Sequence, residues 1–118
     1  MNKKQYQKIA VTVPSGELVS ISERLRNDFQ LATGLFFVSN QSLNDVTCAV
    51  RIDGQEILPA GTDASLFRWT DTISRSEALW DFYSERIAAK SAAFEADFVN
   101  GGSNDVIINV YILLENEQ

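Results

Sequence analysis

The chain has 118 residues, with 10 Lys and Arg against 16 Asp and Glu, so its formal net charge is −6, and 45% of its residues are hydrophobic. These values are typical of one ordinary globular domain. The sequence contains no histidine, and Cys48 is its only cysteine. Its own residues therefore cannot supply a Ser/His/Asp triad, a Cys/His pair, a histidine metal triad, a zinc finger or an intramolecular disulfide. Most familiar hydrolase chemistry is excluded unless a partner subunit contributes the missing groups, and we expect Cys48 to be a small core residue.

Positive charge is concentrated at the start of the chain, where Lys3, Lys4 and Lys8 precede an acidic body. We predict a flexible basic N-terminus over residues 1–8 and a single domain over 9–115. Because an acidic body repels phosphate backbones, we expect no nucleic acid to bind through it. No apolar run approaches the roughly 20 residues of a membrane span, and the start lacks the apolar segment of a signal peptide, so we expect a soluble protein without membrane contact.

The first third of the chain predicts three strands. Residues 8–13 alternate between apolar and polar side chains and are followed by the turn residues Pro14-Ser15-Gly16. Residues 17–25 show a weaker alternation that predicts a short strand. Residues 31–38 are apolar on both parities and rich in aromatic and β-branched residues, which is typical of a centrally buried strand.

The clearest alternation lies in residues 46–52 and predicts a half-buried strand. Asp53-Gly54 follows and favours a type I′ turn, because both central positions of that turn need a positive φ. The return strand is predicted over residues 55–58, where Pro59-Ala60-Gly61 ends it. A further short strand is predicted over residues 66–69.

Residues 74–99 admit two interpretations. Ser74-Arg75-Ser76-Glu77 matches a capping box, and five apolar side chains fall on one helical face, which favours a helix over 75–98. However, three charged side chains fall inside that face, and the apolar residues within 94–98 alternate with acidic ones. The alternation favours a strand that ends at a Gly-Gly loop.

We predict the strand interpretation for most of this segment, with a short helix over 75–83 and strands near 85–90 and 92–99. A loop over 100–105, rich in Gly, Asn and Asp, comes next. Residues 106–114 are the most apolar stretch of the chain, and their closely spaced Val and Ile favour a long strand buried on most of both faces.

About eight short strands separated by turn signals predict a mainly β fold. We predict an antiparallel β-sandwich of jelly-roll-like form with one short helix. The alternative is an α+β fold, in which a helix over 75–98 packs on an antiparallel sheet.

Acidic side chains offer two candidate sites. Glu95 and Asp97 are predicted to lie on one strand face about 7 Å apart, a separation that suits shared acid/base work, although charges on the wet side of an edge strand explain the same pattern. Asp63, Asp71 and the loop over 100–105 offer oxygen ligands for calcium, but their spacing matches no calcium loop. We predict no catalytic residue, no cofactor and no metal, and whether the acidic loops hold an ion stays open.

Aromatic and arginine side chains gather in one part of the sequence. Such residues are usually core, but this composition is also typical of protein interfaces. We hypothesise that this segment packs against a neighbouring subunit. The candidate interface residues are Phe67, Arg68, Trp69, Trp80, Phe82 and Tyr83.

Three stretches of the sequence resemble small structural proteins of bacterial viruses that are built on a jelly-roll or related β-sandwich. The stretches are residues 33–38, 52–59 and 110–115, which together cover under a fifth of the chain. The resemblance implies a multimeric capsid, vertex or spike component. It carries over no site residue, because such proteins assemble rather than catalyse, and the Ala-rich residues 84–96 depart from the pattern.

The leading hypothesis is a non-enzymatic structural or assembly protein whose partner is a second copy of itself or another structural subunit. The alternative is a ligand-binding β-sandwich, for example a carbohydrate module, in which an exposed Trp69, Trp80 or Tyr83 stacks on a sugar ring. A third hypothesis is an enzyme that uses only carboxylates or a metal.

Overall fold

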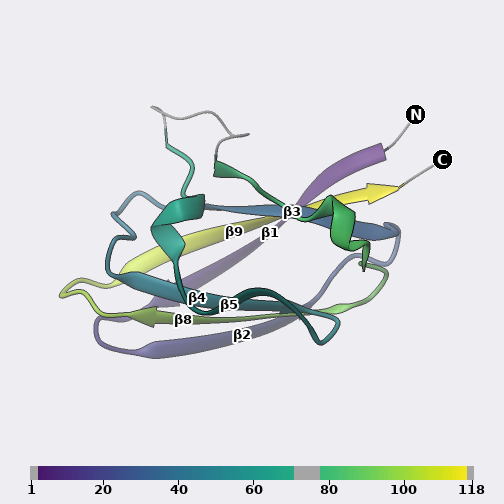
Figure 1. Cartoon of the computed structure of the whole chain (residues 1–118). Helices are drawn as coiled ribbons and strands as arrows, with labels where there is room; N and C mark the ends of the chain where they lie inside the picture. Colours follow the sequence, from purple (N-terminus) through teal and green to yellow (C-terminus); the bar gives the residue numbers. More distant parts are fainter. Residues whose placement is uncertain (1–2, 71–77, 117–118) are drawn as a thin grey trace.

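In the computed structural model, which describes residues 3–70 and 78–116, the chain forms two antiparallel β-sheets packed face to face (Figure 1). The predicted mainly β fold, an antiparallel sandwich, is confirmed. The large sheet has the order β1 (Lys3–Val13), β9 (Val106–Asn116), β3 (Leu31–Val38) and β6 (Trp80–Asp81), and β7 (Ile87–Ala88) also pairs with β3. The small sheet has the order β2 (Leu18–Arg24), β8 (Ala93–Asn100), β4 (Val46–Ile52) and β5 (Gln55–Asp63).

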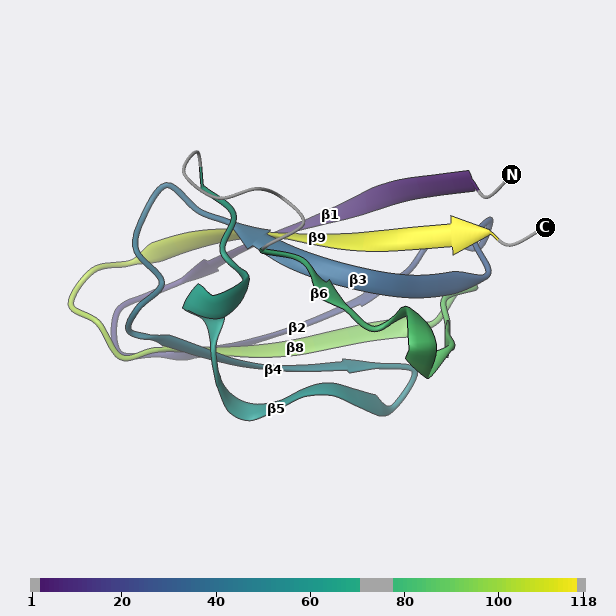
Figure 2. The same ribbon diagram turned by 45° about the horizontal axis from the view of Figure 1, so that its top comes forward.

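The chain passes repeatedly between the two sheets. Strands β1, β3, β6, β7 and β9 belong to the large sheet, whereas β2, β4, β5 and β8 belong to the small one. A turn after Val13 joins β1 to β2, and the two strands are in contact. The 3-10 turn η1 (Ala64–Phe67) follows β5, and η2 (Tyr83–Glu85) follows β6 (Figure 2). Each sheet therefore has one edge strand on the β1–β2 side and another on the β5–β6 side.

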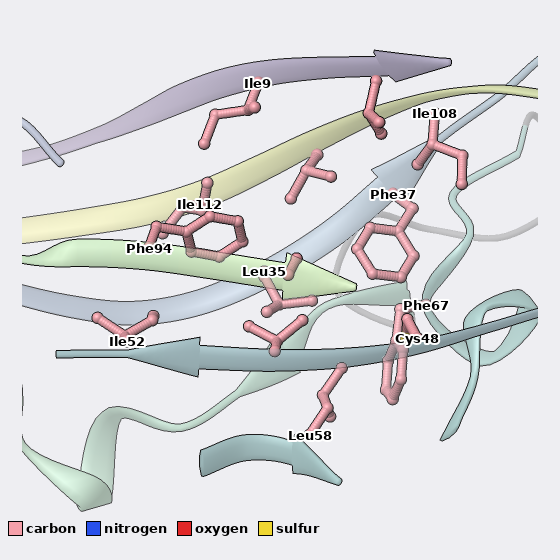
Figure 3. Packing of buried hydrophobic residues seen from close by; sticks show 14 of the residues in the cluster. Ile9, Leu35, Phe37, Cys48, Ile52, Leu58, Phe67, Phe94, Ile108 and Ile112 are labelled. Carbon is pink, nitrogen blue, oxygen red and sulfur yellow. The ribbon is translucent and has the colours of Figure 1, made fainter. Parts of the chain in front are cut away.

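The core lies between the sheets and is dominated by phenylalanine and branched aliphatic side chains (Figure 3). The Phe37 ring meets the Phe98 ring edge-on at a centroid distance of 5.6 Å and the Phe67 ring at 6.2 Å. Strand β3 lies between β9 and the short strands β6 and β7, and every residue over 31–37 is buried. The prediction of a centrally buried strand over 31–38 is confirmed.

The hairpin between β4 and β5 confirms the turn predicted at Asp53-Gly54. Both residues have positive φ, 54° at Asp53 and 78° at Gly54, as a type I′ turn requires. The return strand is longer than predicted, because β5 continues to Asp63. Its pairing with β4 shifts from Val50↔Leu58 to Cys48↔Thr62, so the residues over 59–61 bulge out instead of ending the strand.

Replacing Gly54 by Ala is expected to lower the free energy of unfolding by about 1 kcal/mol, because a Cβ disfavours the left-handed region. No heavy atom lies within 4 Å of a Cβ built at Gly54, so the loss reports backbone strain and not a clash. Urea unfolding measures it. The control is Asp53→Asn, which should leave stability unchanged or slightly higher, since Asn adopts positive φ readily. A Gly54→Ala variant as stable as the parent would contradict the turn assignment.

Two predicted segments differ from the structure, and the alternative fold is excluded. The basic segment over 1–8 was predicted to be flexible, but β1 already begins at Lys3, which pairs with Asn116 of β9. The alternative helix over 75–98 is excluded, because β7 and β8 occupy most of its second half. The short strand predicted over 66–69 is replaced by η1 and a single bridge between Arg68 and Phe37.

The segment that precedes β8 also differs from the prediction. Part of the short helix predicted over 75–83 lies outside the described residues, and its second half is β6 followed by the start of η2. The strand predicted near 85–90 shrinks to β7, because Arg86 before it and Ser91 after it have positive φ, 55° and 56°. The strand predicted near 92–99 is confirmed as β8, since Phe94, Ala96 and Phe98 alternate into the core.

Candidate functional site

The predicted interface residues fall into separate environments. Phe67 and Phe82 are buried, at 9% and 3% exposure, and belong to the core cluster. Trp80 and Tyr83 remain exposed, at 42% and 37%. Trp80 touches the core through Phe67, whose ring centroid is 5.8 Å from its own. The predicted interface residues therefore do not form one continuous surface. Trp80 lies in one exposed region and Tyr83 in another.

Trp80 stands at the side of the sandwich where β5 and β6 form the two sheet edges. A pocket of about 290 Å³ lies there. We call this region the open edge, and it is lined by Glu56, Ile57, Trp80, Asp81, Phe82, Ser84 and Glu85. It combines an exposed indole with three carboxylates, and it suits a partner that brings an apolar surface together with positive charge.

Tyr83 lies nearer the outward face of the large sheet. The Arg86 guanidinium lies 5.6 Å from the centroid of its ring and donates a hydrogen bond of 3.3 Å to its hydroxyl. The backbone N–H of Tyr83 donates to Oδ1 of Asp81 at 2.9 Å. Tyr83 also lines a pocket of about 300 Å³ in which Lys4 and the buried Glu115 form an ion pair at 3.7 Å.

A second aromatic cluster occupies the outward face of the large sheet. Phe36 stacks on Tyr111 at a centroid distance of 5.2 Å and meets Tyr6 and Trp69 edge-on at 5.4 and 6.3 Å. These neighbours leave Phe36 only 3% exposed although it points away from the main core. Trp69 was among the residues singled out from the sequence, whereas Tyr6, Phe36 and Tyr111 of this cluster were not. The available signal was that residues 31–38 are apolar on both parities, which requires a covered outward face.

Arg68, the remaining predicted interface residue, has an internal role. Its guanidinium donates two hydrogen bonds to the carbonyl of Ser39, at 2.9 and 3.3 Å. The adjacent Trp69 donates its backbone N–H to the carbonyl of Phe37 at 2.8 Å. These bonds attach the segment after η1 to the end of β3.

Glu95 and Asp97 lie on one face of β8, as predicted, but β8 is a central strand and not an edge strand. Arg51 of β4 lies between them, with guanidinium nitrogens 3.9 Å from Glu95 and 3.9 Å from Asp97. The hydroxyl of Ser20 also donates to Asp97. The two carboxylates thus form part of a surface charge network.

Of the residues considered for calcium, those that the structure describes do not converge. Asp71 lies outside the described residues, and Asp63 ends β5 opposite Thr47. In the loop over 100–105, Asp105 accepts a hydrogen bond of 2.9 Å from the backbone N–H of Ser15. Over residues 3–70 and 78–116, no group of three or more His, Cys, Asp or Glu side chains is placed to hold a metal ion.

Cys48 lies in the core, as predicted (Figure 3). It is paired with Phe98 in the register of β4 and β8. Burial, with a smaller contribution from the negative charge of Asp63, raises the pKa of the Cys48 thiol to about 12. The thiol is therefore protonated near neutral pH and cannot act as a nucleophile, because the thiolate is the reactive form.

Labelling of folded Cys48 by a disulfide reagent at pH 8 is expected to be slower than in the unfolded chain by on the order of 10³-fold, from the thiolate fraction alone. Above about pH 9 the unfolded chain loses the thiol proton while the folded chain keeps it up to about pH 12, so this group makes stability fall as pH rises through that window. The Cys48→Ala variant should lack this part of the alkaline loss. Equal labelling rates in water and in denaturant would contradict the burial.

Within the described part of the chain, no helix is both long enough and apolar enough to cross a membrane.

Comparison with known proteins adds information about the fold only. No protein-family model matches the sequence, and a search of curated proteins gives no match. The fold is similar to one chain of the crystal structure of the complex between the Aeromonas sobria serine protease (ASP) and the chaperone (ORF2), with a TM-score of 0.59 and 7% identity. The similarity covers 100% of this chain and 27% of that one, so this chain spans just over a quarter of the protein it matches.

Proposed function

We propose that this chain is a non-enzymatic structural protein that acts through subunit–subunit contacts, with Trp80 at the contact. The observation that carries the proposal is the exposure of Trp80. Trp80 is 42% exposed and lines the open-edge pocket, while its ring packs against the ring of Phe67 in the core. Tryptophans held in this way, rigid on one side and accessible on the other, are the residues that most often dominate interface energetics.

The chemistry of the chain supports a role without catalysis. The sequence has no histidine. The single thiol is kept protonated by burial. The acidic pair Glu95 and Asp97 is bound to Arg51. The virion setting remains part of the proposal through the sequence resemblance of residues 33–38, 52–59 and 110–115, and stoichiometric presence in a purified particle is its test.

Light scattering coupled to size exclusion tests the assembly role. The parent protein is expected to form an oligomer, and Trp80→Ala is expected to shift it toward the monomer with little change in melting temperature. Val99→Ala is the matched control, because Val99 is an apolar side chain, 40% exposed, on β8, which is a central strand and not an edge strand. A parent protein that stays monomeric at every concentration refutes the proposal. A Trp80→Ala variant that assembles normally but melts earlier makes Trp80 a core residue.

One observation favours a second candidate function, carbohydrate binding. The exposed Trp80 ring borders a pocket of about 290 Å³ whose rim carries the hydroxyl of Ser84 and the carboxylates of Asp81 and Glu85. An aromatic platform beside hydrogen-bonding groups is the usual arrangement for a sugar ring. This function predicts a monomer whose tryptophan fluorescence changes on titration with glycans, and the change should disappear in Trp80→Ala while Trp69 still fluoresces.

A further inference from the structure

The two lateral edges of the sandwich carry opposite charge. On one side, β1 contains Lys3, Lys4 and Lys8 and no acidic residue, and the charges of Glu23 and Arg24 in the neighbouring edge strand β2 cancel. On the other side, the edge strands β5 and β6 and the turn η2 contain no Lys or Arg, and all their acidic side chains are exposed. We call β1 the basic edge. The acidic edge is formed by Glu56, Asp63, Asp81 and Glu85.

At each edge, the outermost strand forms hydrogen bonds to a neighbouring strand on one side only, within the part of the chain that the structure describes. β1 has 11 residues and pairs only with β9, whereas β5 pairs only with β4. Such edges offer backbone N–H and C=O groups to another strand, and charged side chains decide which strand is accepted. Lys4 remains available, because its side chain is 59% exposed even though it pairs with Glu115 at 3.7 Å.

The sign of the charges selects between two ways of joining copies. A two-fold contact would bring a basic edge against a basic edge, or an acidic edge against an acidic edge, and like charges at close range oppose it. A head-to-tail contact instead brings the lysines of one copy to the carboxylates of the next. Electrostatic complementarity of this kind fixes orientation and suppresses the wrong pairing.

Building on the proposed assembly function, we propose that copies of this chain associate head to tail, with the basic edge of one copy seated on the acidic open edge of the next and Trp80 within the contact. A head-to-tail contact uses two different surfaces, so it generates a ring if the rotation closes and a filament if it does not. Assembly should also weaken as salt rises, because exposed charge pairs are screened within about 8 Å at physiological ionic strength.

Charge reversal tests this contact with purified full-length chains in size exclusion and light scattering. The variant K4E/K8E makes the net charge of the basic edge negative, from +3 to −1, and E56K/D63K/E85K makes that of the acidic edge positive, from −4 to +2. Each variant alone is therefore expected to be monomeric. When the two variants are mixed in equal amounts, every contact between unlike variants joins a positive edge to a negative edge. The mixture should therefore form oligomers in which the two variants alternate. All five substituted side chains are exposed, and circular dichroism and melting temperature check that each variant is folded.

The control variant is E17K/E23K, which reverses charge in the same direction as E56K/D63K/E85K but at exposed positions beside the basic edge. It leaves the acidic edge intact and adds positive charge next to the basic edge, so it should assemble at least as well as the parent protein. If either edge variant assembles alone, or if the mixture fails to recover oligomers, the head-to-tail contact is wrong, while loss of assembly in Trp80→Ala would still support the proposed function. If the parent protein itself is monomeric at low salt and high concentration, the proposed function fails and this contact fails with it.

Discussion

Replacing Phe37 by Ala is expected to lower the free energy of unfolding by about 3–5 kcal/mol. The Phe37 side chain is fully buried on β3, between the rings of Phe98 from the small sheet and Phe67 from η1. Truncation removes apolar surface from the core and leaves a cavity between two sheets that cannot collapse, because both are held by their hydrogen-bond ladders. Since small domains are stable by only about 5–15 kcal/mol, a large fraction of the stability should be lost.

Urea unfolding followed by circular dichroism measures this loss. The matched control is Ile107→Ala, another large apolar residue in the same sheet but 50% exposed. Its cost should stay within about 0.5 kcal/mol, as is usual for surface substitutions. Equal losses for the two variants would show that Phe37 does not bridge the sheets as described.

Replacing Asn100 by Ala is expected to cost about 2–4 kcal/mol, because its loss leaves buried polar groups without partners. The Asn100 side chain is 1% exposed at the end of β8. Its Nδ2 donates to the carbonyls of Val13 at 3.0 Å and Asn104 at 2.8 Å, and its Oδ1 accepts from the N–H of Gly102 at 2.9 Å. One amide therefore joins the end of β1 to the loop that leads into β9.

The substitution Asn100→Asp separates shape from hydrogen bonding. It keeps the acceptor for Gly102 but removes both donors and buries a charge, so it should be at least as destabilising as Asn100→Ala. Asn104→Ala is the control, because Asn104 contributes its backbone carbonyl and its side chain is exposed. Thermal melts of the three variants measure the order. An Asn100→Asp variant as stable as the parent would contradict the role of the two donors.

Elements whose identity depends on nearby residues were predictable from the sequence. The alternation of residues 46–52 and the Asp53-Gly54 turn specify a hairpin, because side-chain period and φ preference act over a few residues. The apolar runs over 31–38 and 106–114 likewise specify strands. Only the first is buried on both faces, because the outward face of β9 is half-buried and Ile107 on it is 50% exposed, so the prediction of burial on both faces was wrong for 106–114. The missing histidine and the single cysteine limit the chemistry of the chain whatever fold it adopts.

Other features depended on which strands became neighbours. Residues 3–8 have the composition of a basic tail, yet they form a strand because β9 is long enough to pair with them. Phe67 and Trp80 belong to one predicted interface segment, but the fold buries the first and leaves the second at a sheet edge. The opposite charges of the two edges also arise only when the strand order is known, since β1 and β5 are distant in sequence and lie at opposite ends of their sheets. Local sequence determines strand and turn preference, whereas exposure and charge placement depend on long-range pairing that no short window contains.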